Sequence, residues 1–221
     1  MDLRVLDDAA GAAGEAAGWT AHHLRGAVRR RGSASIAVSG GTTPASMFAE
    51  LATMDLPWDC ITVFQVDERV APDGDAARNA RLLELFPAGA RLEPMPVTDR
   101  DLSDGAARYG RALPGRFDIV HLGIGDDGHT ASWPPGDPVA DSAEPVALSR
   151  EYRGYVRMTL TPSVVNAARY RLVLAAGADK AAPLEGWLLG NDSLPIHRVR
   201  GSDTVVVVDR AAAARLPGMG R

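Results

Sequence analysis

The sequence lacks several features that would point to secretion, membranes or covalent cross-linking. Its 221 residues include one cysteine, Cys60, so no disulfide can form within the chain, and a reducing compartment is expected. No apolar run approaches the roughly 20 residues that a membrane-spanning helix requires. The chain also does not begin with a basic segment followed by an apolar one, the pattern of a secretory signal. We therefore expect a cytoplasmic protein that does not associate with membranes.

An excess of basic charge is also missing. The 24 basic and 28 acidic residues give a formal net charge of -4, whereas a nucleic-acid-binding surface requires a basic excess. The densest basic run, Arg29–Arg31, falls at the end of a predicted helix, where cations complement the helix dipole. With five histidines and no spacing of the HExxH type, the sequence predicts no metal site either. These absences exclude nucleic acid as an expected partner and leave a small molecule as the expected ligand.

Short apolar runs alternate with alanine-rich or amphipathic segments along the chain. Strands are predicted at residues 3–6, 33–38, 61–66, 117–122, 146–148, 155–160, 171–176 and 204–208. Helices are predicted at residues 8–31, from 44 through 51, 79–86, 102–113, from 162 onward, 177–189, and in an alanine-rich stretch after the last strand. This alternation favours an α/β fold with a mostly parallel sheet flanked by helices on both faces. Without a repeat or linker, residues 1–221 are expected to form a single domain.

A turn rich in glycine and hydroxyl groups follows the strand predicted at residues 33–38. It consists of Ser39, Gly40, Gly41, Thr42 and Thr43. Pro44 suits the first position of the next helix, where its missing N–H needs no partner. Backbone N–H groups at a helix start, together with hydroxyls, form an anion site, although this turn lacks the lysine and spacing of a nucleotide P-loop. An ordinary connection capped by Thr42 or Thr43 is the alternative, and we favour a phosphate site.

A second glycine-rich turn, Gly123–Ser132, follows the strand predicted at residues 117–122. It contains Asp127, Gly128 and His129. Histidine titrates near neutral pH, and a neighbouring carboxylate orients its ring, so this pair suits proton transfer. The alternative is a surface turn whose histidine has no function. The residues that follow the other predicted strands decide between these two interpretations.

Charged residues follow two more strands, and the carboxyl ends of parallel strands share one edge of a sheet. One predicted group supplies backbone N–H groups and cations that suit a phosphate: the Gly40–Gly41 turn, Arg69, Arg157 and Lys180. The other predicted group supplies proton-transfer chemistry: Asp67, Asp127 and His129. The pattern therefore indicates a phosphorylated small molecule that is held at one end and attacked at the other.

Five segments in the same order resemble the bacterial type of 6-phosphogluconolactonase, within the glucosamine-6-phosphate isomerase/6-phosphogluconolactonase family. They are Ser39–Pro44, Asp67–Val70 with Asn79 downstream, Gly123–Ser132, Arg157–Pro162 and Gly177–Ala181. The resemblance implies the ribose-5-phosphate isomerase/glucosamine-6-phosphate deaminase type of fold. It also implies hydrolysis of 6-phospho-D-glucono-1,5-lactone to 6-phosphogluconate in the oxidative pentose phosphate pathway, with no metal or organic cofactor. The substrate-binding residues that we expect are Ser39, Gly40, Gly41, Thr42, Thr43, Arg69, Gly128, Arg157 and Lys180.

In the expected mechanism, His129 takes a proton from water and the resulting hydroxide attacks the lactone carbonyl. Asp127 or Asp67 orients the imidazole, Arg69 or nearby N–H groups stabilise the oxyanion, and His129 returns a proton to the departing ring oxygen. Ser132 lacks the GxSxG context of a nucleophile and is interpreted as structural.

Two positions depart from the pattern that is common in the family. Asp126 stands where a proline is common, and it either changes the proton affinity of the base or faces solvent. Leucine or phenylalanine is common near Trp133–Pro134, and Trp133 is expected to reshape the lip of the pocket.

Two rival functions fit parts of the pattern. A glucosamine-6-phosphate isomerase/deaminase-like enzyme shares the acidic segment and the histidine turn, but it uses a glutamate after the turn, where this chain has Ser132–Pro135. A non-catalytic sugar-phosphate sensor of the same fold needs a DNA-binding module, which neither the alanine-rich first helix nor the acidic net charge indicates. We expect a monomer or a weak homo-oligomer that binds a sugar-phosphate lactone.

Overall fold

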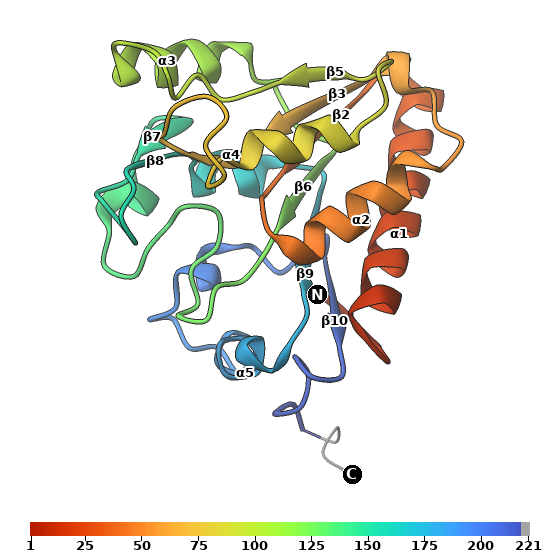
Figure 1. Ribbon diagram of the computed structural model, residues 1–221. Coiled ribbons are helices and arrows are strands. Elements are labelled where there is room, and N and C mark those ends of the chain that lie inside the picture. Colours follow the sequence, from red (N-terminus) through yellow and green to blue (C-terminus); the bar gives the residue numbers. More distant parts are fainter. Residues whose placement is uncertain (218–221) are drawn as a thin grey trace.

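Seven strands form the central sheet of the computed structural model, which describes residues 1–217 (Figure 1). The strands are β1 (Asp2–Leu6), β2 (Ala34–Val38), β3 (Ile61–Gln65), β5 (Arg91–Glu93), β6 (Ile119–Leu122), β9 (Tyr170–Ala175) and β10 (Thr204–Asp209). They lie in the order β1-β10-β9-β6-β2-β3-β5, and every neighbouring pair is parallel. The predicted α/β fold with a mostly parallel sheet is therefore confirmed.

Helices cover both faces of this sheet, because its central strands are apolar on both sides. In β10, Val205 and Val207 belong to the core under one set of helices, whereas Val206 and Val208 belong to the opposite core. The helices on the first face are α1 (Ala9–Arg31) and α2 (Thr42–Ala52). Those that contribute to the second core are α3 (Leu102–Ala112), α4 (Pro162–Ala167) and α5 (Ala181–Leu188). Within residues 1–217, no helix combines the length and the apolar character needed to cross a bilayer.

A small antiparallel sheet lies beside the large one, and it was not predicted. It consists of β4 (Asp67–Arg69), β8 (Arg157–Leu160) and β7 (Val146–Leu148), in the order β4-β8-β7. The chain leaves the large sheet after β3 and pairs with β8, so that Asp67 lies opposite Thr159 and Arg69 lies opposite Arg157. The small sheet therefore brings together two arginines that are far apart in the sequence.

Three predicted helices differ from the structure. Residues 79–85 form a 3-10 helix, because the Glu68 carboxylate accepts the N–H groups of Asn79 and Ala80 at its start. The alanine-rich stretch after β10 forms turns up to residue 217, and residues 218–221 lie outside the described part of the chain. In this stretch the Asp209 side chain accepts the N–H of Ala212. A segment of this length does not nucleate a helix easily. Pro44 is the third residue of α2 and not the first.

Candidate active site

A cavity of about 280 Å³ opens where the carboxyl ends of the central strands meet the small sheet. This is the edge at which parallel α/β sheets place their ligands, and the volume suits a small molecule. Its walls come from the segments after β2, β6 and β9 and from strands β4 and β8. The predicted site residues that line it are Ser39, Gly40, Gly41, Thr42, Thr43, Asp67, Arg69, His129, Arg157 and Lys180.

The turn after β2 brings the backbone close to its neighbours. Gly41 has a φ of 132°, which side-chain-bearing residues rarely adopt. A Cβ on Gly40 would lie 1.8 Å from Oδ1 of Asn79, so only glycine fits there. Helix α2 begins at Thr42, and neither Thr42 nor another side chain caps its N–H groups. The uncapped start of α2 lies at the cavity, as an anion site requires.

Arginine side chains form the cationic wall of the cavity. Arg69 is held by the carbonyl of Ala77 at 2.6 Å and by Oδ1 of Asn79 at 3.1 Å. Among the residues that the structure describes, the buried Nε atoms of Arg69 and Arg157 and the buried Oγ of Ser39 have no hydrogen-bond partner. Buried polar groups are rarely left unpaired, so these atoms indicate where an anionic ligand binds.

The fully buried carboxylate of Glu68 fixes the segment behind this wall. Its oxygens accept the backbone N–H groups of Arg69, Asn79 and Ala80 at 2.7 to 2.8 Å. Its carboxylate also accepts from the side-chain amide of Gln65 and forms an ion pair with Arg78. Glu68 therefore holds β4 and the loop after it together, and Asp67 and Arg69 face the cavity.

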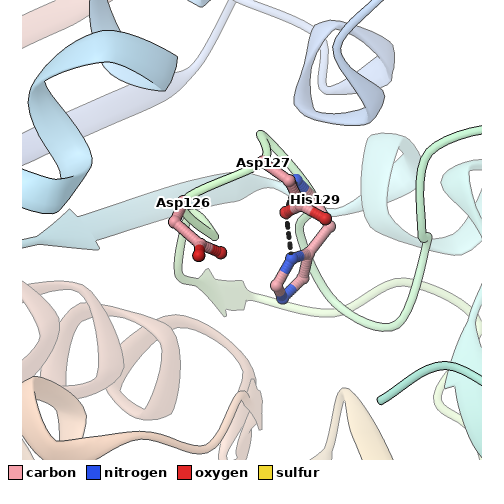
Figure 2. A group of neighbouring side chains, drawn as sticks. All are labelled: Asp126, Asp127 and His129. Carbon is pink, nitrogen blue, oxygen red and sulfur yellow. Dashed lines mark hydrogen bonds and ion pairs between the residues drawn. The ribbon is translucent and has the colours of Figure 1, made fainter.

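His129 is oriented by Asp127, as Figure 2 shows. The ring Nδ1 lies 2.5 Å from Asp127 Oδ1, and the ionised carboxylate only accepts, so Nδ1–H donates and Nε2 carries the lone pair. The hydroxyl of Tyr152 donates to Asp127 Oδ2, also at 2.5 Å. Burial raises the pKa of Asp127, but the hydrogen bonds from Tyr152 and His129 outweigh it and lower that pKa to about 2. Asp127 is therefore an anion at neutral pH.

Glycine is required beneath the imidazole. A Cβ on Gly125 would lie 2.0 Å from Nδ1 of His129. The turn is closed by Gly125 N–H donating to the carbonyl of His129 at 2.7 Å. The glycines of this motif therefore allow the ring to lie against the backbone.

Asp67 has a different environment. It is 4% exposed, and its Oδ2 accepts the hydroxyl of Ser132 at 2.7 Å. Burial raises the pKa of Asp67, although the Ser132 hydrogen bond and the charges of Arg69 and Arg157 act in the opposite direction. The expectation left open which carboxylate orients His129, and the contacts assign that position to Asp127.

One group of side chains in the described residues has the composition of a metal site. Asp126, Asp127 and His129 place a potential ligand atom each within 4.8 Å of one another (Figure 2). Asp127 is already bound by His129 and Tyr152, and Asp126 forms a 2.6 Å ion pair with Arg153. The donors are thus engaged within the protein, and we propose no metal for this site.

Gly128 and Trp133 lie where the sequence did not place them, whereas Ser132 is buried as a structural residue and Asp126 is exposed, which was one of its two expected alternatives. Gly128, predicted to bind substrate, does not line the cavity; its φ is 81°, and its carbonyl accepts the N–H of Ile196. Trp133 was expected at the pocket lip but is fully buried, with Nε1–H donating to the carbonyl of Leu160. Ser132 is buried against Asp67. Asp126 is exposed and pairs with Arg153, which lowers its pKa.

Two residues near the site were missed by the sequence interpretation. Arg153 lines the cavity and Tyr152 binds Asp127, and both come from the connection between β7 and β8. The only local signal is an Arg-Gly pair between two tyrosines, which is consistent with a tight two-residue turn.

Comparison with known proteins places this arrangement in a family. The model of the glucosamine-6-phosphate isomerases/6-phosphogluconolactonase family matches residues 7–208. The chain belongs to this family. A 6-phosphogluconolactonase of Mesorhizobium japonicum is 36% identical over 200 residues, which are 83% of this chain and 83% of that protein. A 6-phosphogluconolactonase of Pseudomonas putida is 32% identical over 213 residues, which are 89% and 88% of the two chains.

Solved structures of the family have the same fold. The crystal structure of a 6-phosphogluconolactonase from Shewanella baltica aligns with a TM-score of 0.86 at 25% identity, over 95% of this chain and 97% of that one. A monomeric glucosamine-6-phosphate deaminase aligns with a TM-score of 0.85 at 21% identity, over 97% of this chain and 100% of the other. Because both branches of the family align equally well, the fold does not distinguish their activities.

Proposed function

We propose that this chain is a 6-phosphogluconolactonase, which hydrolyses 6-phospho-D-glucono-1,5-lactone to 6-phosphogluconate in the oxidative pentose phosphate pathway. One observation carries the proposal: His129, with Nδ1 held by Asp127, lines a cavity whose other wall contains unpaired arginine nitrogens. This pairs a proton acceptor with an anion site in one small cavity. The sequence relatives named 6-phosphogluconolactonase support the same activity.

In the proposed mechanism, Nε2 of His129 removes a proton from water, and the hydroxide attacks the lactone carbonyl carbon. The anion of Asp127 stabilises the imidazolium that forms. Arg69 or the N–H groups of the glycine turn stabilise the oxyanion. The ester bond to the ring oxygen then breaks, and the imidazolium donates its proton to that oxygen. The phosphate binds to Arg157, Lys180 and the uncapped start of α2.

The deaminase alternative is disfavoured by the residues after the histidine turn. That activity implies a glutamate after the turn, and the corresponding residues here are Ser132, Trp133 and two prolines. Neither Ser132 nor Trp133 has a carboxylate, and both are buried, Ser132 with its hydroxyl bound to Asp67. Release of ammonia from glucosamine 6-phosphate would support this alternative.

The decisive test compares the wild type with His129→Ala on freshly prepared lactone in a pH-stat. The wild type is expected to exceed the spontaneous rate, and the variant to lose about 100-fold or more of that acceleration, since general-base help contributes about 10²–10⁴-fold. Calorimetric titration with inorganic phosphate is the control for an intact anion site. A near-normal rate in His129→Ala, with phosphate binding retained, would overturn the assignment of the base.

A further inference from the structure

Tyr152 reaches the site from a turn whose backbone leaves it little freedom. Tyr152 and Tyr155 exchange backbone hydrogen bonds of 2.9 and 3.2 Å across a two-residue turn. The central residues of the turn, Arg153 and Gly154, have φ values of 50° and 83°, as tight hairpin turns with two left-handed residues require. The tip of the turn is also tied to the histidine turn by the Arg153–Asp126 ion pair. The position of the Tyr152 ring is therefore set by the fold.

The hydroxyl of Tyr152 controls the Asp127 carboxylate. It donates to Oδ2 at 2.5 Å while Oδ1 receives Nδ1–H of His129 at 2.5 Å, so both oxygens are engaged. Oδ1 also accepts the backbone N–H of His129 at 3.1 Å, but both bonds from His129 hold the same oxygen, and the terminal torsion of an aspartate is broad, so the carboxylate can still turn about that oxygen. The bond from Tyr152 holds the other oxygen, which fixes the carboxylate plane and the imidazole that it orients. The Tyr152 ring also packs edge-on against His129, with ring centroids 5.5 Å apart.

Cations from both sides of the cavity surround the Tyr152 ring. The guanidinium carbons of Arg153 and Arg157 each lie 5.1 Å from its centroid, within the range of cation–π attraction. Arg157 belongs to the cationic wall of the cavity, so the Tyr152 ring lies between that wall and the Asp127–His129 pair. Burial and the hydrogen bond to Asp127 raise the pKa of Tyr152 to about 12, so the hydroxyl keeps its proton and remains a donor at neutral pH.

We propose that Tyr152 is a positioning residue for lactone hydrolysis, whose hydroxyl locks Asp127 and thereby aims Nε2 of His129 at the attacking water. This inference rests on the proposed lactonase function. It goes beyond it because neither the histidine turn nor the cationic wall contains Tyr152. The hydroxyl also disperses the negative charge of Asp127, which moderates how strongly the carboxylate holds the imidazolium.

The test is Tyr152→Phe, which removes one oxygen and keeps the ring, with Tyr155→Phe as the matched control from the same hairpin. For Tyr152→Phe we expect kcat to fall about tenfold, as for the loss of one hydrogen bond to a charged group, with KM unchanged within about twofold. The acid limb of its kcat/KM–pH profile is expected to move to higher pH, because Asp127 then binds the imidazolium more strongly. The charged or titratable groups around Asp127 and Tyr152 are His129, Asp126, Arg153 and Arg157. Tyr155→Phe is expected to leave kcat, KM and the profile unchanged.

A double-mutant cycle distinguishes positioning from packing. If Tyr152 acts through Asp127, Tyr152→Phe is expected to have almost no further effect on kcat in the Asp127→Asn background, because coupled residues are not additive. Proton NMR of the free protein supplies a readout that does not depend on activity. The Nδ1 proton of His129 is expected far downfield in the wild type and in Tyr155→Phe, and broadened or shifted in Tyr152→Phe.

Two outcomes would overturn the proposal. One is a Tyr152→Phe variant with the wild-type kcat, pH profile and Nδ1 proton signal. The other is a loss of kcat that is fully additive with Asp127→Asn, since that loss reflects general packing. Failure of the proposed function appears separately, as a wild type that does not exceed the spontaneous rate, while the NMR comparison still tests whether Tyr152 orders His129.

Discussion

Asp67 and Asp127 lie at the same site in opposite electrostatic environments. Asp67 is buried beside Ser132, and burial raises its pKa despite two nearby arginines. Asp127 is more exposed, and hydrogen bonds from Tyr152 and from the ring and backbone N–H groups of His129 lower its pKa to about 2. Asp127 is thus an anion that orients His129, whereas Asp67 lies among the cations that are expected to receive phosphate. The difference shows that burial and hydrogen bonds, and not the residue type, set the pKa of each carboxylate, and it supports the proposal that Asp127 serves proton transfer while Asp67 belongs to the anion end.

The largest expected effect comes from removing the charge at the proton-transfer end. Asp127→Asn is expected to lower kcat/KM for the lactone by about 100-fold, because the imidazolium loses its anionic partner. Stopped-flow or pH-stat rates check this. Asp59→Asn is the matched control, since Asp59 is exposed, lies at the amino end of β3 and does not line the cavity, and its rate is expected to stay within about twofold of the wild type. Equal losses in the two variants would contradict the role of Asp127.

The next largest effects come from two glycines, one beside His129 at the proton-transfer end and one beside Asn79 at the anion end of the site. Gly125→Ala pushes a Cβ into the His129 ring and is expected to lower kcat about tenfold or more, since small displacements of a catalytic group are costly. Gly40→Ala displaces Asn79, which holds Arg69, and is expected to raise KM by about tenfold instead. Gly18→Ala is the control, because nothing lies within 4 Å of its added Cβ. The same change in kcat and KM for both variants would contradict the division of the site into a proton-transfer end and an anion-binding end.

A smaller effect tests the anion end directly. Asp67→Asn removes a negative charge beside Arg69 and Arg157, so inorganic phosphate is expected to bind at least about threefold more tightly. Asp127→Asn is expected to leave phosphate affinity nearly unchanged. Isothermal titration calorimetry of both variants measures this. Weaker phosphate binding in Asp67→Asn would show that Asp67 organises the arginines and does not oppose the anion.

The smallest effects are on stability, and they are expected to have opposite signs. The pKa of Asp127 falls from 3.8 to about 2 on folding, and solvent screening reduces the corresponding stabilisation to about 1.5 kcal/mol. This contribution is present above pH 4 and is lost between about pH 4 and pH 2. Asp127→Asn is therefore expected to lower Tm at pH 7 by roughly 5 °C. The pKa of Asp67 is raised, so its ionisation opposes folding at neutral pH, and Asp67→Asn is expected to raise Tm at pH 7.

Differential scanning calorimetry measures both shifts. The gain in Asp67→Asn is expected to shrink at acidic pH, where the wild-type carboxyl is also protonated. Shifts of the same sign at pH 7 would mean that the two carboxylates do not differ in environment as the contacts indicate.

Much of the large sheet is predictable from the sequence because its signals are local. The valines of β10 and the apolar run of β9 are buried on both faces, and alanine-rich α1 lies as expected between β1 and β2. The strands β7 and β8 were predicted, but the small antiparallel sheet was not, because β4 has only three residues and becomes a strand by pairing with the distant β8. A helix was predicted at residues 79–86, but its 3-10 form was not, and the Glu68 carboxylate that binds its first N–H groups lies in β4, a contact that the local sequence does not reveal.

The sequence by itself determined the chemical inventory of the site and the sheet edge at which it gathers. The motifs after β2 and β6 contain the glycines, the hydroxyls and His129, and the predicted parallel sheet implied that they lie at one edge, where the cavity is found. Only the tertiary structure decided how the carboxylates are used. Asp127 binds His129 while Asp67 binds Ser132, and Tyr152 arrives from a hairpin that no local motif ties to the site. Composition and spacing show which groups are present, but orientation and charge state depend on burial and on hydrogen bonds between segments that only folding brings together.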